Sequence, residues 1–107
     1  MKKIELMKPV KEFEIGGEVF TVDTSSEAVN AWSKVWGEVS AEINAILADP
    51  EQEMTEEMLL TFYEEGLDAT FGKGSYEKLY ALCGKSLYVM DDLIKKLTVE
   101  FTNLKKV

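Results

Sequence analysis

Apolar side chains recur at alternating steps of three and four residues in two long stretches of the chain. The first stretch contains Val29, Trp32, Trp36, Val39, Ile43 and Ile46, and the second contains Leu87, Met90, Ile94, Leu97, Phe101 and Leu104. This spacing places all members of a stretch on one side of an α-helix. It predicts one amphipathic helix that ends at about Ala48 and a second of about 20 residues that follows Ser86.

Residues that favour helix ends stand at the expected boundaries of these helices. Thr24, Ser25 and Ser26 precede the first helix, which is expected to start at about Glu27, and Pro50 follows it. A hydroxyl oxygen at such a position accepts a hydrogen bond from a free backbone N–H, whereas proline stops a helix before it. Thr55 predicts the start of a further helix, from Glu56 to about Thr70.

The segment Phe71-Gly72-Lys73-Gly74-Ser75 interrupts the helical pattern. Two glycines are expected to end one helix, and Ser75 to cap a short helix from about Tyr76 to Cys83. Gly, Lys and Ser before a helix are superficially similar to a phosphate-binding loop. The full spacing of that loop is absent and no strand leads into the segment, so a turn between two helices is favoured.

Residues 11–23, KEFEIGGEVFTVD, alternate between apolar and polar and predict a β-hairpin with a Gly16-Gly17 turn. The turn sets Phe13 opposite Phe20, Ile15 opposite Glu18, and Lys11 opposite Val22. One face of the hairpin then carries Phe13, Ile15, Phe20 and Val22. Because a two-stranded ribbon is not stable alone in water, this face must cover a helix, either the first or the last, or join a neighbouring subunit.

These elements predict an α+β fold that is mainly α, with an N-terminal hairpin and about four helices. A chain of 107 residues is expected to form a single domain. Residues 1–10 are expected to be loosely ordered, because Pro9 breaks any early helix, and residues 25–107 to be helical. The chain has no apolar run typical of a signal peptide or a membrane span, which favours a cytoplasmic protein.

The charge of the chain argues against two classes of partner. Twenty acidic and twelve basic residues give a formal net charge of −8, and all of the basic residues are Lys. Phosphate backbones and anionic membranes attract clustered Lys and Arg, so neither nucleic acid nor a membrane is an expected partner. A basic protein partner is compatible with this charge, as is a simple role in solubility.

The sequence contains few candidate catalytic residues. The absence of His removes the commonest general base and metal ligand, and the one Cys, Cys83, is best interpreted as a small buried apolar residue. Five carboxylates are interpreted as parts of solvated helix faces and not as a convergent site, namely Glu64, Glu65, Asp68, Asp91 and Asp92. We therefore expect no enzymatic activity, no metal and no cofactor.

Apolar surfaces remain as the candidate sites of interaction with a protein partner. Two Trp, five Phe and four Tyr residues are many for a small monomer to bury. Trp32 and Trp36 fit either a core or an interface anchor, and the sequence leaves both alternatives open. The candidate interaction residues are Trp32, Trp36, Val39, Ile43, Met90, Ile94, Leu97 and Phe101, with the hairpin face of Phe13, Ile15, Phe20 and Val22.

The order of these features resembles a family of small proteins encoded in the tail-gene region of long-tailed phages and prophages of Gram-positive bacteria. In that family the hairpin commonly reads ING or IGG before an aromatic residue, and a later motif reads FGEG-S/T-x-x-K-apolar-F/Y. The matching residues here are Phe71, Gly72, Gly74, Ser75, Lys78, Leu79 and Tyr80. Lys73 replaces the usual Glu, and Ala81-Leu82-Cys83-Gly84 replaces a Gly that often follows the aromatic. The resemblance extends over residues 11 to about 105.

This resemblance implies a tail-assembly or tail-chaperone-like protein in the bacterial host, which would shield the tape measure protein or tail-tube components before assembly. A homo-oligomer is expected. The alternative is an acidic inhibitor or regulator that occupies a basic surface of a host protein. Such an inhibitor would carry its acidic residues on one face, whereas this sequence spreads them over nearly every element.

Overall fold

The computed structural model describes residues 1–105 and contains a β-hairpin followed by four helices. The hairpin consists of β1 (Val10–Ile15) and β2 (Glu18–Asp23). The helices are α1 (Ser26–Ala48), α2 (Glu56–Phe71), α3 (Ser75–Leu82) and α4 (Leu87–Leu104). The predicted fold class, α+β and mainly α, is confirmed. Residues 106 and 107, which were expected to be helical, lie outside the described residues.

The hairpin has the predicted register. Phe13 pairs with Phe20, Ile15 with Glu18, and Lys11 with Val22, and the strand begins at Val10, one residue earlier than expected. Both residues of the Gly16-Gly17 turn have a positive φ, at 59° and 87°. Only glycine adopts this conformation without strain, which explains why the chain reverses at this pair.

The caps of three helices form as the sequence predicts, but the cap of α3 does not. The side chains of Ser25, Thr55 and Ser86 accept hydrogen bonds from backbone N–H groups in the first turns of α1, α2 and α4. Ser75, expected to cap α3, is instead its first residue. The carboxylate of Asp68 in α2 accepts a hydrogen bond from the backbone N–H of Tyr76 at 2.9 Å. A side chain from another helix therefore replaces the local cap.

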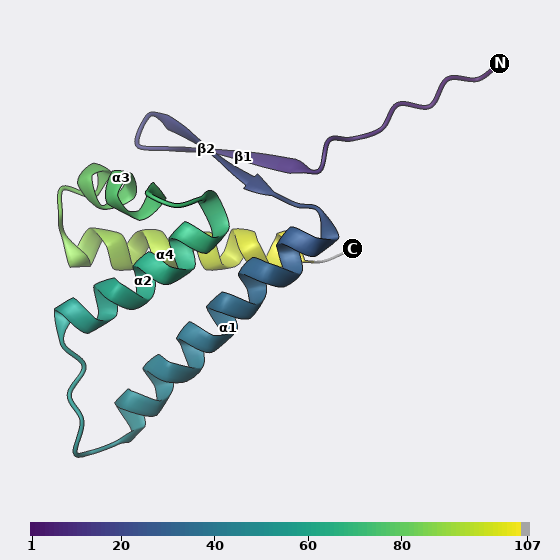
Figure 1. Ribbon diagram of the computed structural model, residues 1–107. Coiled ribbons are helices and arrows are strands. Elements are labelled where there is room, and N and C mark those ends of the chain that lie inside the picture. Colours follow the sequence, from purple (N-terminus) through teal and green to yellow (C-terminus); the bar gives the residue numbers. More distant parts are fainter. Residues whose placement is uncertain (106–107) are drawn as a thin grey trace.

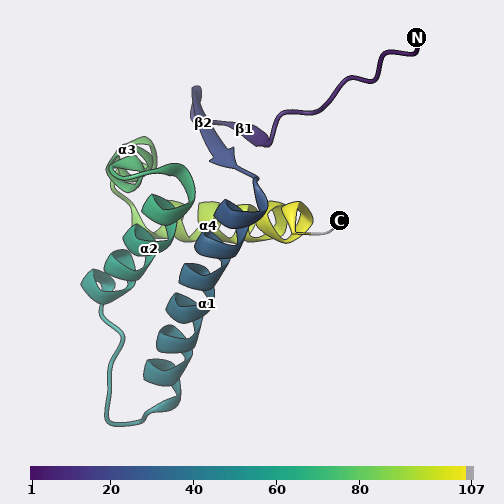
Figure 2. The same ribbon diagram turned by 45° about the vertical axis from the view of Figure 1, so that its right-hand side comes forward.

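Helices α1 and α2 lie side by side in opposite directions, and α4 crosses behind them in the view of Figure 1. Figure 2 shows the same arrangement after a rotation, with α3 above the start of α4. One hydrophobic cluster connects the hairpin with all four helices. Its buried members are Phe20, Val22, Trp32, Tyr63, Leu67, Leu79, Cys83, Met90, Leu97 and Phe101.

The apolar face of the hairpin packs within the chain, in part on a helix that was not expected to contact it. The rings of Phe13 and Phe20 meet the ring of Phe71 edge-on, with centroid distances of 6.3 and 5.8 Å. Phe71 is the last residue of α2, a helix that was not expected beneath the hairpin. The face also meets the last helix, as expected, because Ile15 lines a hollow together with Val89 and Leu93 of α4. Because α1 begins only three residues after the end of β2, it leads away from the hairpin and leaves α2 beneath it.

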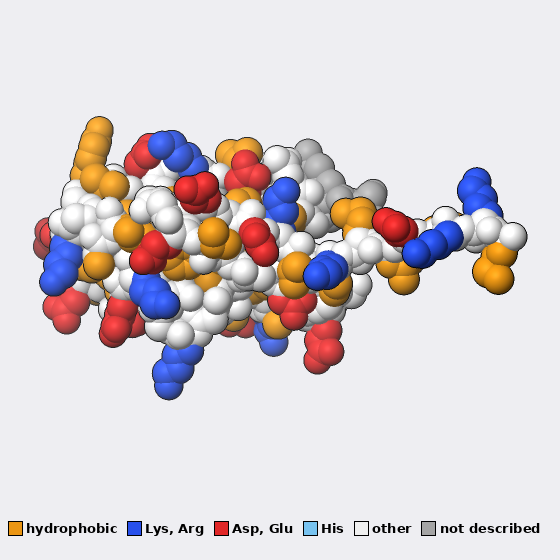
Figure 3. Space-filling model, turned by 90° about the horizontal axis from the view of Figure 1, so that it is seen from above, with side chains coloured by type: hydrophobic (Ala, Val, Ile, Leu, Met, Phe, Trp, Pro, Cys, Tyr) orange, Lys and Arg blue, Asp and Glu red, His pale blue; other side chains and the backbone are white. Residues whose placement is uncertain are grey.

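Residues 1–9 precede the hairpin and contain neither helix nor strand. In Figures 1 and 2 they extend away from the helices, and Figure 3 shows their side chains standing apart from the body of the molecule. We call these nine residues the arm. Their expected loose order stays a prediction.

Candidate interaction surfaces

Most of the residues predicted to contact a partner lie in the core of the chain itself. Seven of them are buried, namely Phe20, Val22, Trp32, Val39, Met90, Leu97 and Phe101. The other five, Phe13, Ile15, Trp36, Ile43 and Ile94, are half-buried. A partner cannot reach the seven buried side chains while the fold is closed. The three-four spacing of the five that lie in helices therefore reports packing between helices of one chain, and the interface interpretation is wrong for all seven positions.

Phe101 lies at the centre of an aromatic cluster that joins three helices. Its ring centroid is 5.4 Å from that of Trp32, 6.0 Å from that of Trp36 and 6.0 Å from that of Phe71. These four rings come from α1, α2 and α4. Tilted and edge-on contacts at such distances are favourable beyond the burial of area alone. The open question about Trp32, core or interface, is thus answered in favour of the core.

Trp36 lies against a glycine that the sequence analysis did not single out. A Cβ atom built on Gly66 would lie 2.6 Å from the indole ring of Trp36. The indole N–H of Trp36 donates a hydrogen bond to the Thr70 hydroxyl at 2.7 Å, and this hydroxyl donates to the Gly66 carbonyl at 2.8 Å. At Gly37, the glycine inside α1, a Cβ would meet no atom within 4 Å. The sequence signal that could have indicated this contact was the glycine inside the second helix, because glycine weakens a helix.

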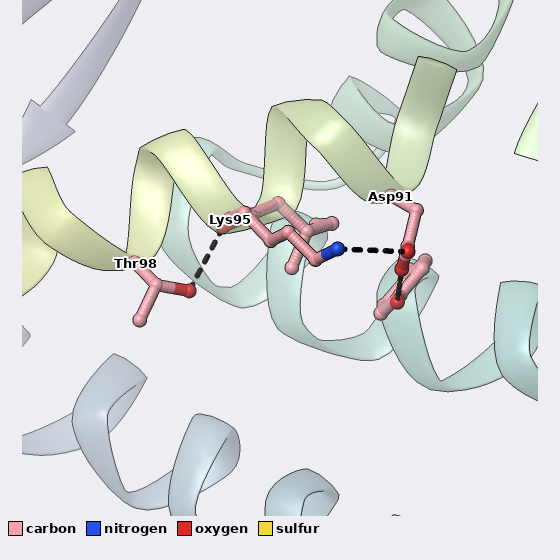
Figure 4. Close-up of polar contacts among 5 residues, drawn as sticks. Asp91, Lys95 and Thr98 are labelled. Carbon is pink, nitrogen blue, oxygen red and sulfur yellow. Dashed lines mark hydrogen bonds and ion pairs between the residues drawn. The ribbon is translucent and has the colours of Figure 1, made fainter. Parts of the chain in front are cut away.

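Three of the carboxylates considered as acid or base groups, Asp68, Asp91 and Asp92, have structural partners. In Figure 4 the carboxylate of Asp91 lies between the amine of Lys95 and a phenol from α2. This phenol belongs to Tyr63 and donates a hydrogen bond to Asp91, while Lys95 lies 3.7 Å from the second carboxylate oxygen. Burial, followed by the bond to Asp91 and its charge, raises the pKa of Tyr63 above its ordinary value. The phenol therefore stays neutral and connects α2 to α4.

An apolar hollow of about 200 Å³ lies where the hairpin turn meets the start of α4, and we call it the hairpin–α4 groove. It is lined by Ile15, Gly16, Leu82, Cys83, Val89, Asp92, Leu93 and Lys96. Leu82 is 38% exposed and Val89 is 44% exposed. Asp92 and Lys96 form an ion pair at 2.8 Å beside these apolar side chains. The groove is thus an uncovered apolar surface with a charged pair at its side.

The hairpin–α4 groove also contains the single cysteine, which is not a reactive group. Cys83 is buried, and this burial raises the pKa of its thiol. A protonated thiol is a poor nucleophile. The interpretation of Cys83 as a small apolar residue agrees with this environment.

A second, larger groove of about 490 Å³ lies on α2 and the start of α3, and we call it the acidic groove. It is lined by Glu56, Glu57, Leu60, Thr61, Glu64 and Tyr76. All three charged side chains in this lining are acidic. The ring of Tyr76 stacks on that of Tyr80 with a centroid distance of 5.6 Å, which holds Tyr76 at the side of the groove. The acidic groove therefore combines negative charge with an apolar floor.

Within residues 1–105, no three His, Cys, Asp or Glu side chains gather in an arrangement that could hold a metal ion. No helix in the same range is both long and apolar enough to cross a membrane. Comparisons with models of protein families, with curated proteins and with solved structures found no match for this chain. The two grooves are therefore the basis for an argument about function.

Proposed function

We propose that this chain is a non-enzymatic assembly factor that binds a protein of the phage tail, either the tape measure protein or the tail-tube protein, in the bacterial cytoplasm. The observation that supports protein binding is the hairpin–α4 groove. The identity of the client rests on the resemblance of residues 11 to about 105 to tail-region proteins.

The hairpin–α4 groove has the composition of a small binding surface for a protein. Leu82 and Val89 offer exposed apolar area at its mouth, and the ion pair of Asp92 and Lys96 lies beside them. Apolar contact supplies most of the affinity at such surfaces, while neighbouring charges restrict the orientation of the partner. A groove of this size suits one or two large apolar side chains from a client helix.

The acidic inhibitor is the second candidate function, and the surface seen in Figure 3 gives it less support. Lysine and acidic side chains are intermixed on this face, which carries the hairpin. A protein that occupies a strongly basic surface would be expected to present acidic side chains alone there.

Co-expression with the tape measure and tail-tube proteins encoded near its gene would test the proposal. We expect tagged wild-type chain to retain one of them, and the Val89→Asp variant to retain about tenfold less, because a buried carboxylate in the groove costs binding energy. Val99→Asp is the matched control, since Val99 is an exposed valine of α4 outside the groove lining. Failure to retain either protein, or equal retention by both variants, would contradict the proposal.

A further inference from the structure

The arm exposes more apolar area than a segment of its length normally leaves in water. Four large apolar side chains occur in its nine residues, Met1, Ile4, Leu6 and Met7, and each is at least 79% exposed. Exposed apolar groups that cluster in this way usually mark a surface of interaction. The arm is therefore a candidate segment for contact with another surface.

The polar residues of the arm give it a positive charge within an acidic chain. Residues 1–9 contain Lys2, Lys3 and Lys8 against the single acid Glu5. In an extended segment alternate side chains point to the same side. Lys2, Ile4, Leu6 and Lys8 would then share one side, with two apolar residues between two cations.

The acidic groove is complementary to this side of the arm. Glu56, Glu57 and Glu64 supply negative charge, and Leu60 with Tyr76 supplies apolar area between them. Glu56 and Glu64 are separated by about 12 Å along α2. An extended arm of nine residues spans about 30 Å, so it can cross the groove with residues to spare on both sides.

We propose that the arm of one copy of this chain binds in the acidic groove of a second copy. In Figures 1 and 2 the arm leads away from the helices, whereas the start of α2 lies at the opposite end of the molecule. In each copy the arm and the acidic groove therefore lie at different ends of the molecule. Such a head-to-tail contact uses two different surfaces, and it produces closed rings or open chains. This self-association is independent of the identity of any client.

Light scattering after size-exclusion chromatography of the full chain would test the contact. We expect self-association that weakens as salt rises, because exposed ion pairs are screened. Two double variants remove the contact from opposite sides. The arm variant combines Ile4→Asp with Leu6→Asp, and the groove variant combines Glu57→Lys with Glu64→Lys. Either double variant should raise the dissociation constant of self-association by about tenfold or more. Glu38→Lys with Glu42→Lys is the control, since these exposed acids of α1 lie outside the groove lining and should change association little.

Mixing the two variants separates this contact from other modes of association. The arm variant retains an intact groove and the groove variant an intact arm, so the mixture should form heterodimers that neither variant forms alone. Carbodiimide cross-linking of isotope-mixed wild-type copies should join Lys2, Lys3 or Lys8 to Glu56, Glu57 or Glu64 between different copies. A wild-type monomer at all concentrations, no heterodimer on mixing, or arm-to-groove links only within one copy would overturn the proposal. Circular dichroism of each variant checks that the fold is intact.

Discussion

The indole of Trp36 occupies the space where any residue other than glycine at position 66 would place its Cβ atom, 2.6 Å from the ring carbons. Helices α1 and α2 can approach each other here only because Gly66 has no side chain. We expect Gly66→Ala to lower the free energy of unfolding by about 1–3 kcal/mol, because the Trp36 ring or the helices must move. Urea denaturation followed by circular dichroism would measure this loss.

Gly37→Ala is the control for the same chemical change in a helix. A Cβ at Gly37 meets nothing within 4 Å, and the residue lies inside α1. The substitution should therefore raise the free energy of unfolding by about 1 kcal/mol, through helix propensity alone. If both variants changed stability in the same direction, the close packing of Trp36 on Gly66 would be contradicted.

Thr70→Val should destabilise the fold by about 1 kcal/mol, because it leaves the indole N–H of Trp36 without its acceptor. Thr61→Val is the matched control. The Thr61 hydroxyl also bonds to a carbonyl of α2, but at an exposed position, so its loss should change stability by less than about 0.5 kcal/mol. Urea denaturation followed by tryptophan fluorescence would compare the two variants, and equal losses would argue against a role for the Trp36 hydrogen bond.

Tyr63→Phe should change how stability depends on alkaline pH. The pKa of Tyr63 is raised from its ordinary value of 10.0 in the folded state, so the unfolded chain releases this proton first. The contribution of the phenol to stability is therefore complete below pH 10 and is lost as the pH rises further. At neutral pH the variant should lose about 1.5 kcal/mol, the lower end of the range for a hydrogen bond to a charged group, because Asp91 is partly exposed.

Thermal unfolding of the wild type and Tyr63→Phe between pH 7 and 11 would test this dependence. The difference in melting temperature between them should be constant at neutral pH and shrink above pH 10. A difference that grew above pH 10 would contradict the raised pKa.

Ser33→Ala should stabilise the protein. The Ser33 hydroxyl oxygen is buried between α1 and α4 and has no hydrogen-bond partner among residues 1–105. Removing an unsatisfied buried hydroxyl removes its desolvation cost, so we expect a gain of about 1 kcal/mol, including a small gain in helix propensity. Ser40→Ala, at an exposed position of α1, should show the propensity gain alone. A calorimetric gain no larger for Ser33→Ala than for Ser40→Ala would refute this expectation.

Local signals in the sequence predicted the local parts of the fold. The register that pairs Phe13 with Phe20 follows from a two-residue turn and the period of a strand. The starts of α1, α2 and α4 follow from hydroxyl side chains that bond within the next turn. Each of these features depends on residues that are neighbours along the chain, which is why their positions could be read directly.

The relative placement of these elements could not be read in the same way. Phe71 faces the hairpin because α2 ends beneath the hairpin and α1 runs away from it. The alternation of apolar residues along the chain encodes neither the end point of α2 nor the direction of α1. The cap of α3 by Asp68 likewise joins two helices across a turn. Long-range contacts of this kind depend on the whole arrangement of the chain.

The candidate surfaces were missed for a related reason. The three-four stripes identified the core, so the residues on them are buried or half-buried. Leu82 and Val89 lie off both stripes, and only the position of the hairpin turn brings them together with Ile15. An apolar residue that does not fit the stripe of its helix was the signal that could have indicated a surface site.

The place of Phe101 near the end of α4 has a consequence for synthesis on the ribosome. Phe101 contacts Trp32, Trp36 and Phe71, all of which emerge from the ribosome well before it. Until residue 101 emerges, these three rings lack their shared neighbour, and the nascent chain exposes apolar surface that is prone to aggregation. Early termination within α4 would therefore yield chains that contain a complete hairpin and α1–α3 sequence but cannot close the core.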